Sequence, residues 1–145
     1  MTHLYALVIL LSAIALLESI QTRPNCSQLG KYALDPDLRE RLATEIIANQ
    51  PIKDVSVPLV YLCALEGMAG LILENSQKPL NCLSDLGIFP LITEMDDEAD
   101  AGVDALAKAA VGEWALHIPR LTFASSFGCN HVLEDGRHIY LCLFK

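Results

Sequence analysis

The sequence predicts an α+β fold in which three helices pack on a small antiparallel sheet that ends in a C-terminal β-hairpin. Two observations support this prediction. In three separate segments apolar residues recur every three or four positions, which is the spacing of one helix face. The C-terminal stretch is instead rich in β-branched and aromatic residues on both sides of Asp135-Gly136, a dipeptide typical of two-residue hairpin turns. A length of 145 residues fits one domain.

The first helix is expected over residues 36–49. Asp35 can cap its N-terminus, and Pro36 suits its first position because a proline has no backbone N–H to leave unpaired. Leucine and isoleucine then recur at every fourth residue, until Pro51 ends the helix. These signals together predict an amphipathic helix with one buried face.

The second helix is expected over residues 58–75 and is apolar enough to be largely buried. Gly67 and Gly70 lower its helix propensity, which indicates close packing by a neighbouring segment. Residues 76–93 are expected to form a loop. A third helix is expected over residues 97–117, with acidic residues in its first turn at the positive end of the helix dipole.

The hairpin turn fixes the pairing of the two C-terminal strands. If Glu134 faces Arg137, counting outward from the turn places Cys129 opposite Cys142 at a non-hydrogen-bonded position. Cα atoms there are about 4.5 Å apart, which lies within the range of about 4.4–6.8 Å that a disulfide needs. We therefore predict a Cys129–Cys142 disulfide.

The same hairpin places His131 and His138 close to these two cysteines, which raises the possibility of a metal site. On a regular strand His138 lies roughly 13 Å from Cys142, at about 3.3 Å per residue. Tetrahedral zinc ligands must all lie within about 2–2.3 Å of the ion. We therefore expect no metal site made of these four residues, and we expect no cofactor.

Residues 4–17 form an uncharged apolar run at the N-terminus. The run is shorter than the roughly 20 residues of a membrane-spanning helix, and it is typical of a secretory signal peptide. We expect a signal peptide over residues 1–21 and a single disulfide-bonded domain over residues 22–145. No second apolar span follows, so we expect a secreted, extracellular protein with no membrane span after signal removal.

All five cysteines follow the predicted signal peptide, where an oxidising compartment favours disulfides. With the hairpin pair assigned, Cys63–Cys82 is the default second pair, although links from these cysteines to the hairpin remain open. Cys26 is then free or intermolecular, and a disulfide-linked dimer through Cys26 is possible. Asn25 begins the Asn-Cys-Ser sequon, so it is the predicted glycosylation site.

Charge and motifs restrict the function further. A formal net charge of −8 argues against nucleic acid and against anionic membrane surfaces, because both need Lys and Arg clusters. No Gly-x-Ser-x-Gly motif and no glycine-rich phosphate loop is present. His117 is a candidate general base, but a histidine near a helix C-terminus is already favoured by the dipole. The acidic run at 96–100 does not fit the EF-hand template and is expected to start a helix.

Two stretches resemble the CAP superfamily of secreted proteins (the SCP/TAPS group), in the form of the nematode activation-associated secreted protein-related products. The first is LVYLCALEGMAGLILENSQKPLNC, and the second is the closing hairpin, FGCNHV followed by HIYLCLF. The matching residues are Tyr61, Cys63, Leu65, Glu66, Ala69, Cys82, Gly128, Cys129, Cys142 and Phe144. The resemblance implies a shortened, divergent α-β-α sandwich. The family's Gly-Glu-Asn and Gly-His-x-Thr-Gln motifs, which supply its cleft histidines and glutamates, are absent here.

These observations predict a secreted, non-enzymatic binding protein, of the kind that parasites excrete to act on a host or extracellular partner. The partner is expected to be a protein or a lipid. The first alternative is a small carrier of lipids or other hydrophobic ligands, suggested by the apolar helix with its glycines and by lipid binding among CAP relatives. The second alternative is a secreted hydrolase that uses His117 or His131, which has no assembled nucleophile.

Overall fold

The computed structural model describes residues 24–52, 58–75, 80–97 and 101–145. The predicted signal peptide, residues 1–21, lies outside the described residues and stays a prediction. Within the described part of the chain, no helix has the length and apolar character needed to cross a membrane.

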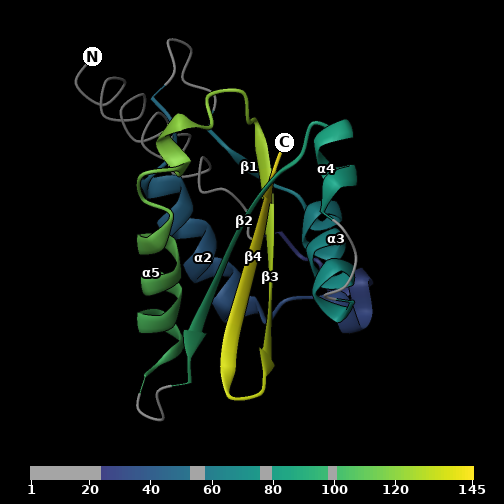
Figure 1. The fold of residues 1–145 in the computed structure, drawn as a ribbon, viewed down its shortest axis with the longest axis vertical. Coiled ribbons are helices and arrows are strands. Elements are labelled where there is room, and N and C mark those ends of the chain that lie inside the picture. The colour runs from purple at the N-terminus through teal and green to yellow at the C-terminus, as the bar shows by residue number, and fades with distance from the viewer. Residues whose placement is uncertain (1–23, 53–57, 76–79, 98–100) are drawn as a thin grey trace, which may run out of the picture.

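The fold is α+β, as predicted, with helices on both sides of one sheet (Figure 1). The elements in chain order are η1 (Ser27–Tyr32), α2 (Pro36–Ala48), β1 (Val60–Tyr61), α3 (Cys63–Glu74), α4 (Asn81–Asp85), β2 (Phe89–Asp96), α5 (Val103–Glu113), η2 (Ile118–Arg120), β3 (Ser126–Glu134) and β4 (Arg137–Phe144).

The sheet has the strand order β1-β3-β4-β2, and it separates two helical layers. Helices α2 and α5 cover one face, while α3 and α4 lie on the other side (Figure 1). The prediction of a purely antiparallel sheet is wrong, because β1 runs parallel to β3. Parallel pairing is possible here because a long connection, which includes three α-helices, the short helix η2 and β2, separates these two strands.

The core has two parts because side chains alternate across the strands. Phe127, Cys129, Tyr140, Cys142 and Phe144 face α2 and α5 in the larger part. In the smaller part, the leucines between them on β4 face α3 and α4. Alternate residues of β3 and β4 therefore face different helical layers.

The first predicted helix is confirmed. Helix α2 begins at Pro36, and the Asp35 carboxylate accepts hydrogen bonds at 3.1 Å from the backbone N–H groups of Asp37 and Leu38. The helix ends at Ala48, one residue before the predicted boundary.

The other boundaries differ from the predictions. The second helix begins only at Cys63, because Val60 and Tyr61 pair with β3 as a short strand. The third helix is confined to Val103–Glu113. The predicted loop over 76–93 is wrong, since it contains α4 and the start of β2.

The hairpin has the predicted register. Glu134 pairs with Arg137, and Cys129 pairs with Cys142. Asp135 and Gly136 have φ angles of 50° and 73°, which is the left-handed conformation that a type I′ turn requires at both positions.

Candidate functional site

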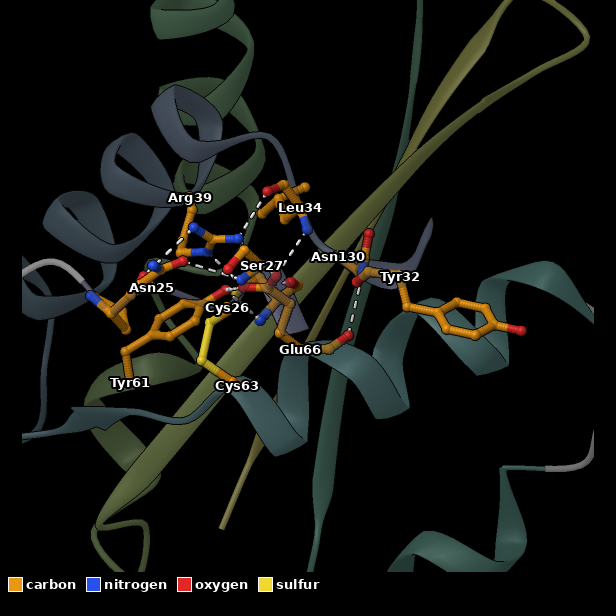
Figure 2. Close-up of a disulfide and its surroundings, with 12 residues drawn as sticks. Asn25, Cys26, Ser27, Tyr32, Leu34, Arg39, Tyr61, Cys63, Glu66 and Asn130 are labelled. Carbon is orange, nitrogen blue, oxygen red and sulfur yellow. Dashed lines mark hydrogen bonds and ion pairs between the residues drawn. A yellow bond between two sulfur atoms is a disulfide. The ribbon is translucent and has the colours of Figure 1, made fainter. Parts of the chain in front are cut away.

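The structure contains two disulfides within the chain, Cys26–Cys63 and Cys129–Cys142. The hairpin disulfide joins the two residues that the register pairs. The predicted Cys63–Cys82 pair is wrong: Cys63 is bonded to Cys26, with the Cα atoms 5.3 Å apart (Figure 2). The segment that follows Cys26 packs as η1 against α3, which brings Cys26 to the first residue of that helix. Cys82 lies exposed on α4, outside both disulfides.

The new pairing removes the predicted role of Cys26. Its side chain is fully buried and bonded within the chain, so the predicted free or intermolecular Cys26 is wrong, and so is a dimer linked through it. The neighbouring Asn25 is exposed, and its Oδ1 accepts a hydrogen bond from the backbone N–H of Ser27 at 3.1 Å. Glycosylation of Asn25 stays a prediction.

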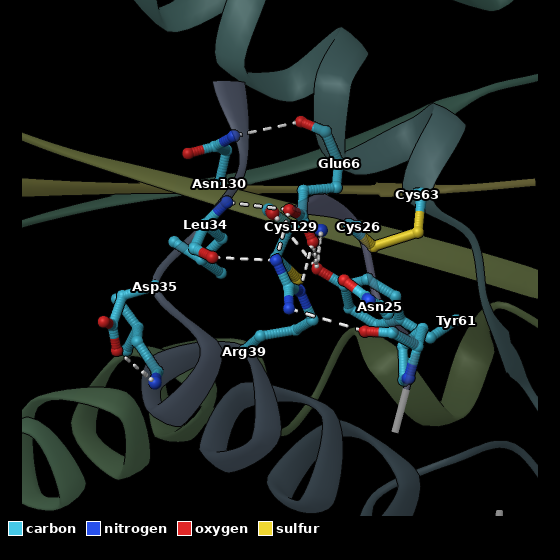
Figure 3. A network of polar contacts seen from close by, with 12 residues as sticks. Asn25, Cys26, Leu34, Asp35, Arg39, Tyr61, Cys63, Glu66, Cys129 and Asn130 are labelled. Atoms are coloured by element: carbon cyan, nitrogen blue, oxygen red, sulfur yellow. Dashed lines mark hydrogen bonds and ion pairs between the residues drawn. A yellow bond between two sulfur atoms is a disulfide. The ribbon is translucent and has the colours of Figure 1, made fainter. Parts of the chain in front are cut away.

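A buried carboxylate, that of Glu66 on α3, lies at the centre of a polar network beside this disulfide (Figure 3). Its Oε1 accepts hydrogen bonds from the backbone N–H of Leu34 at 2.7 Å and from Arg39 Nη2 at 2.8 Å. Its Oε2 accepts from Arg39 Nε at 2.7 Å and from the Tyr61 hydroxyl at 2.6 Å. A carboxylate offers about four acceptor positions, and all of them are occupied by groups of the chain itself.

The donors of this network are held in fixed protonation states. The hydrogen bond to Glu66 raises the pKa of Arg39, whose Nη2 also donates to the carbonyl of Leu34 at 2.8 Å. Burial, followed by the hydrogen bond to Glu66, raises the pKa of Tyr61 well above its ordinary value. Neither Arg39 nor Tyr61 exchanges a proton near neutral pH, so these two donors hold the Glu66 carboxylate in place.

Asn130 extends the network to the sheet. Its Nδ2 donates to the carbonyl of Tyr32 at 2.7 Å and to the carbonyl of Glu66 at 3.1 Å. The N-terminal segment, α3 and β3 are therefore joined at one point. The sequence analysis missed this network, although Glu66 is the only charged residue between Val60 and Leu73 and could have drawn attention to it.

A second polar cluster lies at the other end of the sheet, near the hairpin turn. His131 Nε2 and His138 Nδ1 are 2.8 Å apart, and His138 Nε2 is 3.1 Å from Asp97 Oδ1. The two ring planes are nearly parallel, with an interplanar angle of 20°, and their centroids are 5.0 Å apart. This separation is little more than the N···N distance plus one ring width, so the imidazoles meet end to end. We call Asp97, His138 and His131 the histidine chain.

The histidine chain corrects one part of the sequence interpretation. Distances measured along one strand separate His138 from the cysteines, but His131 and His138 meet diagonally across the two strands. The third member, Asp97, follows β2, and the sequence analysis assigned it to the start of a helix. Both cysteines of the hairpin are in the disulfide, so the histidines are the only two of the four residues with open ligand atoms.

Burial governs the ionisation of this cluster. Partial burial, and then the charge of His138, lowers the pKa of His131 to about 4. Tyr140 lies beneath it, with ring centroids 4.6 Å apart, and burial raises the pKa of that tyrosine to about 12. His131 is therefore a neutral imidazole at physiological pH.

The remaining candidates from the sequence lie apart. His117 is exposed between α5 and η2 and belongs to neither polar cluster. Of the acidic run, Asp96 and Asp97 are exposed, while residues 98–100 lie outside the described residues. In the described ranges, no group of three or more His, Cys, Asp or Glu side chains has an arrangement that could hold a metal ion.

Comparison with known proteins identifies the family. Residues 26–144 match the model of the family described as "Ancylostoma-associated secreted protein related". A comparison with the curated proteins finds no match.

Solved structures that share the fold include the following three. The Ancylostoma-secreted protein Ac-ASP-7 is 19% identical, with a TM-score of 0.60 over 77% of this chain and 69% of that chain. Its manganese-bound form is 17% identical, with a TM-score of 0.59 over 77% and 70%. The Hookworm Platelet Inhibitor is 16% identical, with a TM-score of 0.52 over 77% and 70%. The resemblance read from the α3 and hairpin residues is thereby confirmed, and the chain belongs to the Ancylostoma-associated secreted protein-related family, as a divergent member of the CAP superfamily.

Proposed function

We propose that this protein acts outside the cell as a non-enzymatic binding protein with an extracellular host protein as its partner. The observation that carries the proposal is the saturation of Glu66. The most buried carboxylate of the described chain accepts four hydrogen bonds from the chain itself, and therefore has no acceptor position left for a substrate. Membership of a family of secreted hookworm proteins supports an extracellular site of action.

The histidine chain does not supply a hydrolase either. An activated nucleophile needs a serine, cysteine or threonine within hydrogen-bond reach of the base. The polar partners of His131 and His138 in the described structure are each other and Asp97, and the ring packed on His131 is that of the buried Tyr140. This argues against the hydrolase alternative based on His131.

The carrier alternative loses its main support. The glycines of α3 face side chains of the same protein: a Cβ at Gly67 would lie 3.0 Å from Leu29, and a Cβ at Gly70 would lie 2.7 Å from Asn130 Nδ2. These glycines therefore allow η1 and β3 to pack closely against α3, and they do not leave space for a bound ligand. Native mass spectrometry of the purified protein is expected to show the mass of the chain without lipid.

An exposed aromatic pair offers a contact surface for a protein partner. Phe89 and Phe123 are 43% and 59% exposed, and their rings meet edge to face with centroids 6.4 Å apart. Aromatic side chains are enriched at the centres of protein interfaces. The pair is also held by a rigid element, because Phe89 begins β2.

The experiment measures binding of the fluorescently labelled, secreted protein to intact host platelets, since one structural relative is named a platelet inhibitor. We expect saturable binding that unlabelled protein displaces, and roughly tenfold weaker binding for Phe123→Ser. The matched control is Leu133→Ser, which removes a similarly exposed apolar side chain from the hairpin. If the labelled protein binds neither platelets nor plasma proteins saturably, the proposal is wrong. The proposal is also wrong if the protein turns over a substrate.

A further inference from the structure

The histidine chain contains two imidazole nitrogens that point at each other, and no assigned role accounts for them. We propose that His131 and His138 bind one divalent transition-metal ion of the class that prefers imidazole, represented by Zn²⁺, between His131 Nε2 and His138 Nδ1. Both nitrogens are ligand atoms of that class, whereas Ca²⁺ and Mg²⁺ require oxygen ligands. The site lies on strands β3 and β4, within the hairpin stretches that carry the family resemblance, but neither histidine is among the residues that match the family.

The geometry requires only a small adjustment. Zn–N bonds are about 2.0–2.1 Å, so two nitrogens of a tetrahedral site lie about 3.3 Å apart. The two ring nitrogens are already 2.8 Å apart, and the ring planes are nearly parallel. A separation of roughly 0.5 Å, together with a tilt of the rings that turns both nitrogen lone pairs toward a common point, replaces the hydrogen bond by a pair of metal bonds.

Asp97 prepares His138 for this role. His138 Nε2 donates its proton to Asp97 Oδ1 at 3.1 Å, which leaves the lone pair of Nδ1 directed at His131. A carboxylate that accepts the second N–H of a metal-binding histidine fixes the tautomer and the ring orientation. When the ion replaces the bridging hydrogen, His131 carries its proton on Nδ1, so both ligands stay neutral and no net proton is released.

The surroundings favour a cation with solvent ligands. His131 lies on the buried ring of Tyr140, which limits its rotation, while His131 is only partly buried and Asp97 is exposed, so water can complete the coordination. The formal net charge of the chain is −8, which attracts a cation. The nearest cation on β4, Arg137, is on the opposite face of the sheet and is paired with Glu94 at 2.8 Å.

The test is a calorimetric titration of the secreted chain, produced without a polyhistidine tag, with Zn²⁺ alone. We expect one ion per chain in the unaltered protein and at least a tenfold loss of affinity in His131→Gln and in His138→Gln. His117→Gln is the matched control, because it removes an exposed histidine that does not belong to the histidine chain and should leave binding unchanged. Asp97→Asn should weaken binding about 10-fold, in the range typical for partners of metal-bound histidines, whereas the neighbouring Asp96→Asn should not.

NMR of the histidine ring protons distinguishes loss of the metal site from loss of the folded structure. In the unaltered protein, added Zn²⁺ should shift the signals of His131 and His138 and leave those of His117 in place. If Zn²⁺ does not bind, if it shifts His117 instead, or if His131→Gln and His138→Gln keep the unaltered affinity, the proposal is overturned. If near-ultraviolet circular dichroism shows that a histidine variant has lost its native packing, Asp97→Asn is used in its place. This variant changes an exposed side chain and tests the same metal geometry.

Discussion

Replacing Gly128 with alanine should destabilise the protein more than the addition of a single methyl group suggests. An added Cβ would lie 2.5 Å from the backbone nitrogen of Glu66 and 2.6 Å from the carbonyl oxygen of Leu62, whereas comfortable contacts need roughly 3.5 Å. Both neighbours are backbone atoms of the α3 N-terminus, so no side-chain rotation relieves the clash. The helix cannot withdraw without lengthening the 2.8 Å hydrogen bond from Leu62 to Phe127 and the contacts of Glu66.

A displacement of about 1 Å is therefore needed between α3 and the sheet. Overpacking of this kind costs about 1–3 kcal/mol when side chains adjust, and the fixed backbone places Gly128→Ala at or above about 3 kcal/mol. For a domain of this size, that corresponds to a melting temperature lower by roughly 10 °C. Urea and thermal unfolding, followed by circular dichroism with the disulfides intact, measure both quantities.

The matched control is the same substitution at Gly112. This glycine lies in α5, is exposed, and has no atom within 4 Å of an added Cβ. Gly112→Ala should therefore stabilise the protein by about 0.5–1 kcal/mol, because alanine loses less backbone entropy in a helix. If Gly128→Ala unfolds within about 0.5 kcal/mol of the unaltered chain, the close approach of β3 to α3 is not as described.

Three further predictions concern the polar network, the disulfides and pH. Arg39→Met should lower the free energy of unfolding by about 3–5 kcal/mol in urea titrations, because it leaves the Glu66 carboxylate buried without its cation; a loss below 1 kcal/mol would contradict the description. Peptide mapping without reduction should find Cys26 linked to Cys63, and replacing both by alanine should cost about 4 kcal/mol, against about 3 kcal/mol for the shorter hairpin loop. The pKa of His131 is lowered to about 4 from its ordinary 6.5, so the unfolded chain binds more protons between these values. Stability measured with a chelator present should therefore fall as the pH drops from about 6.5 toward 4, and equal stability at pH 7 and pH 5 would refute the lowered pKa.

Local signals account for the parts of the fold that the sequence predicted. The Asp35 cap and the Asp135-Gly136 turn each act within a few residues, so the start of α2 and the hairpin register could be derived without tertiary information. Strand β2 gave no such signal. It carries a proline at its second position, which an edge strand tolerates because one side of its backbone is unpaired.

The candidate sites were harder to predict because they depend on contacts between distant segments. His138 meets Asp97 across 41 residues, and Leu34 meets Glu66 across 32. Neither separation has a periodicity that a single sequence displays. The partner of Cys63 is undetermined for the same reason, since spacing alone allows several connectivities.

The two disulfides also determine how the protein responds to mechanical force. When tension is applied at Pro24 and Lys145, the covalent links at Cys26–Cys63 and Cys129–Cys142 carry it past the enclosed segments, which together span about 50 residues. Helix α2 and the hairpin turn then bear no load, however far the rest of the chain is extended. At roughly 3.5 Å per residue, reduction would release about 170 Å of hidden chain length. The length to which the unfolded chain can be stretched therefore depends on whether these two disulfides are oxidised.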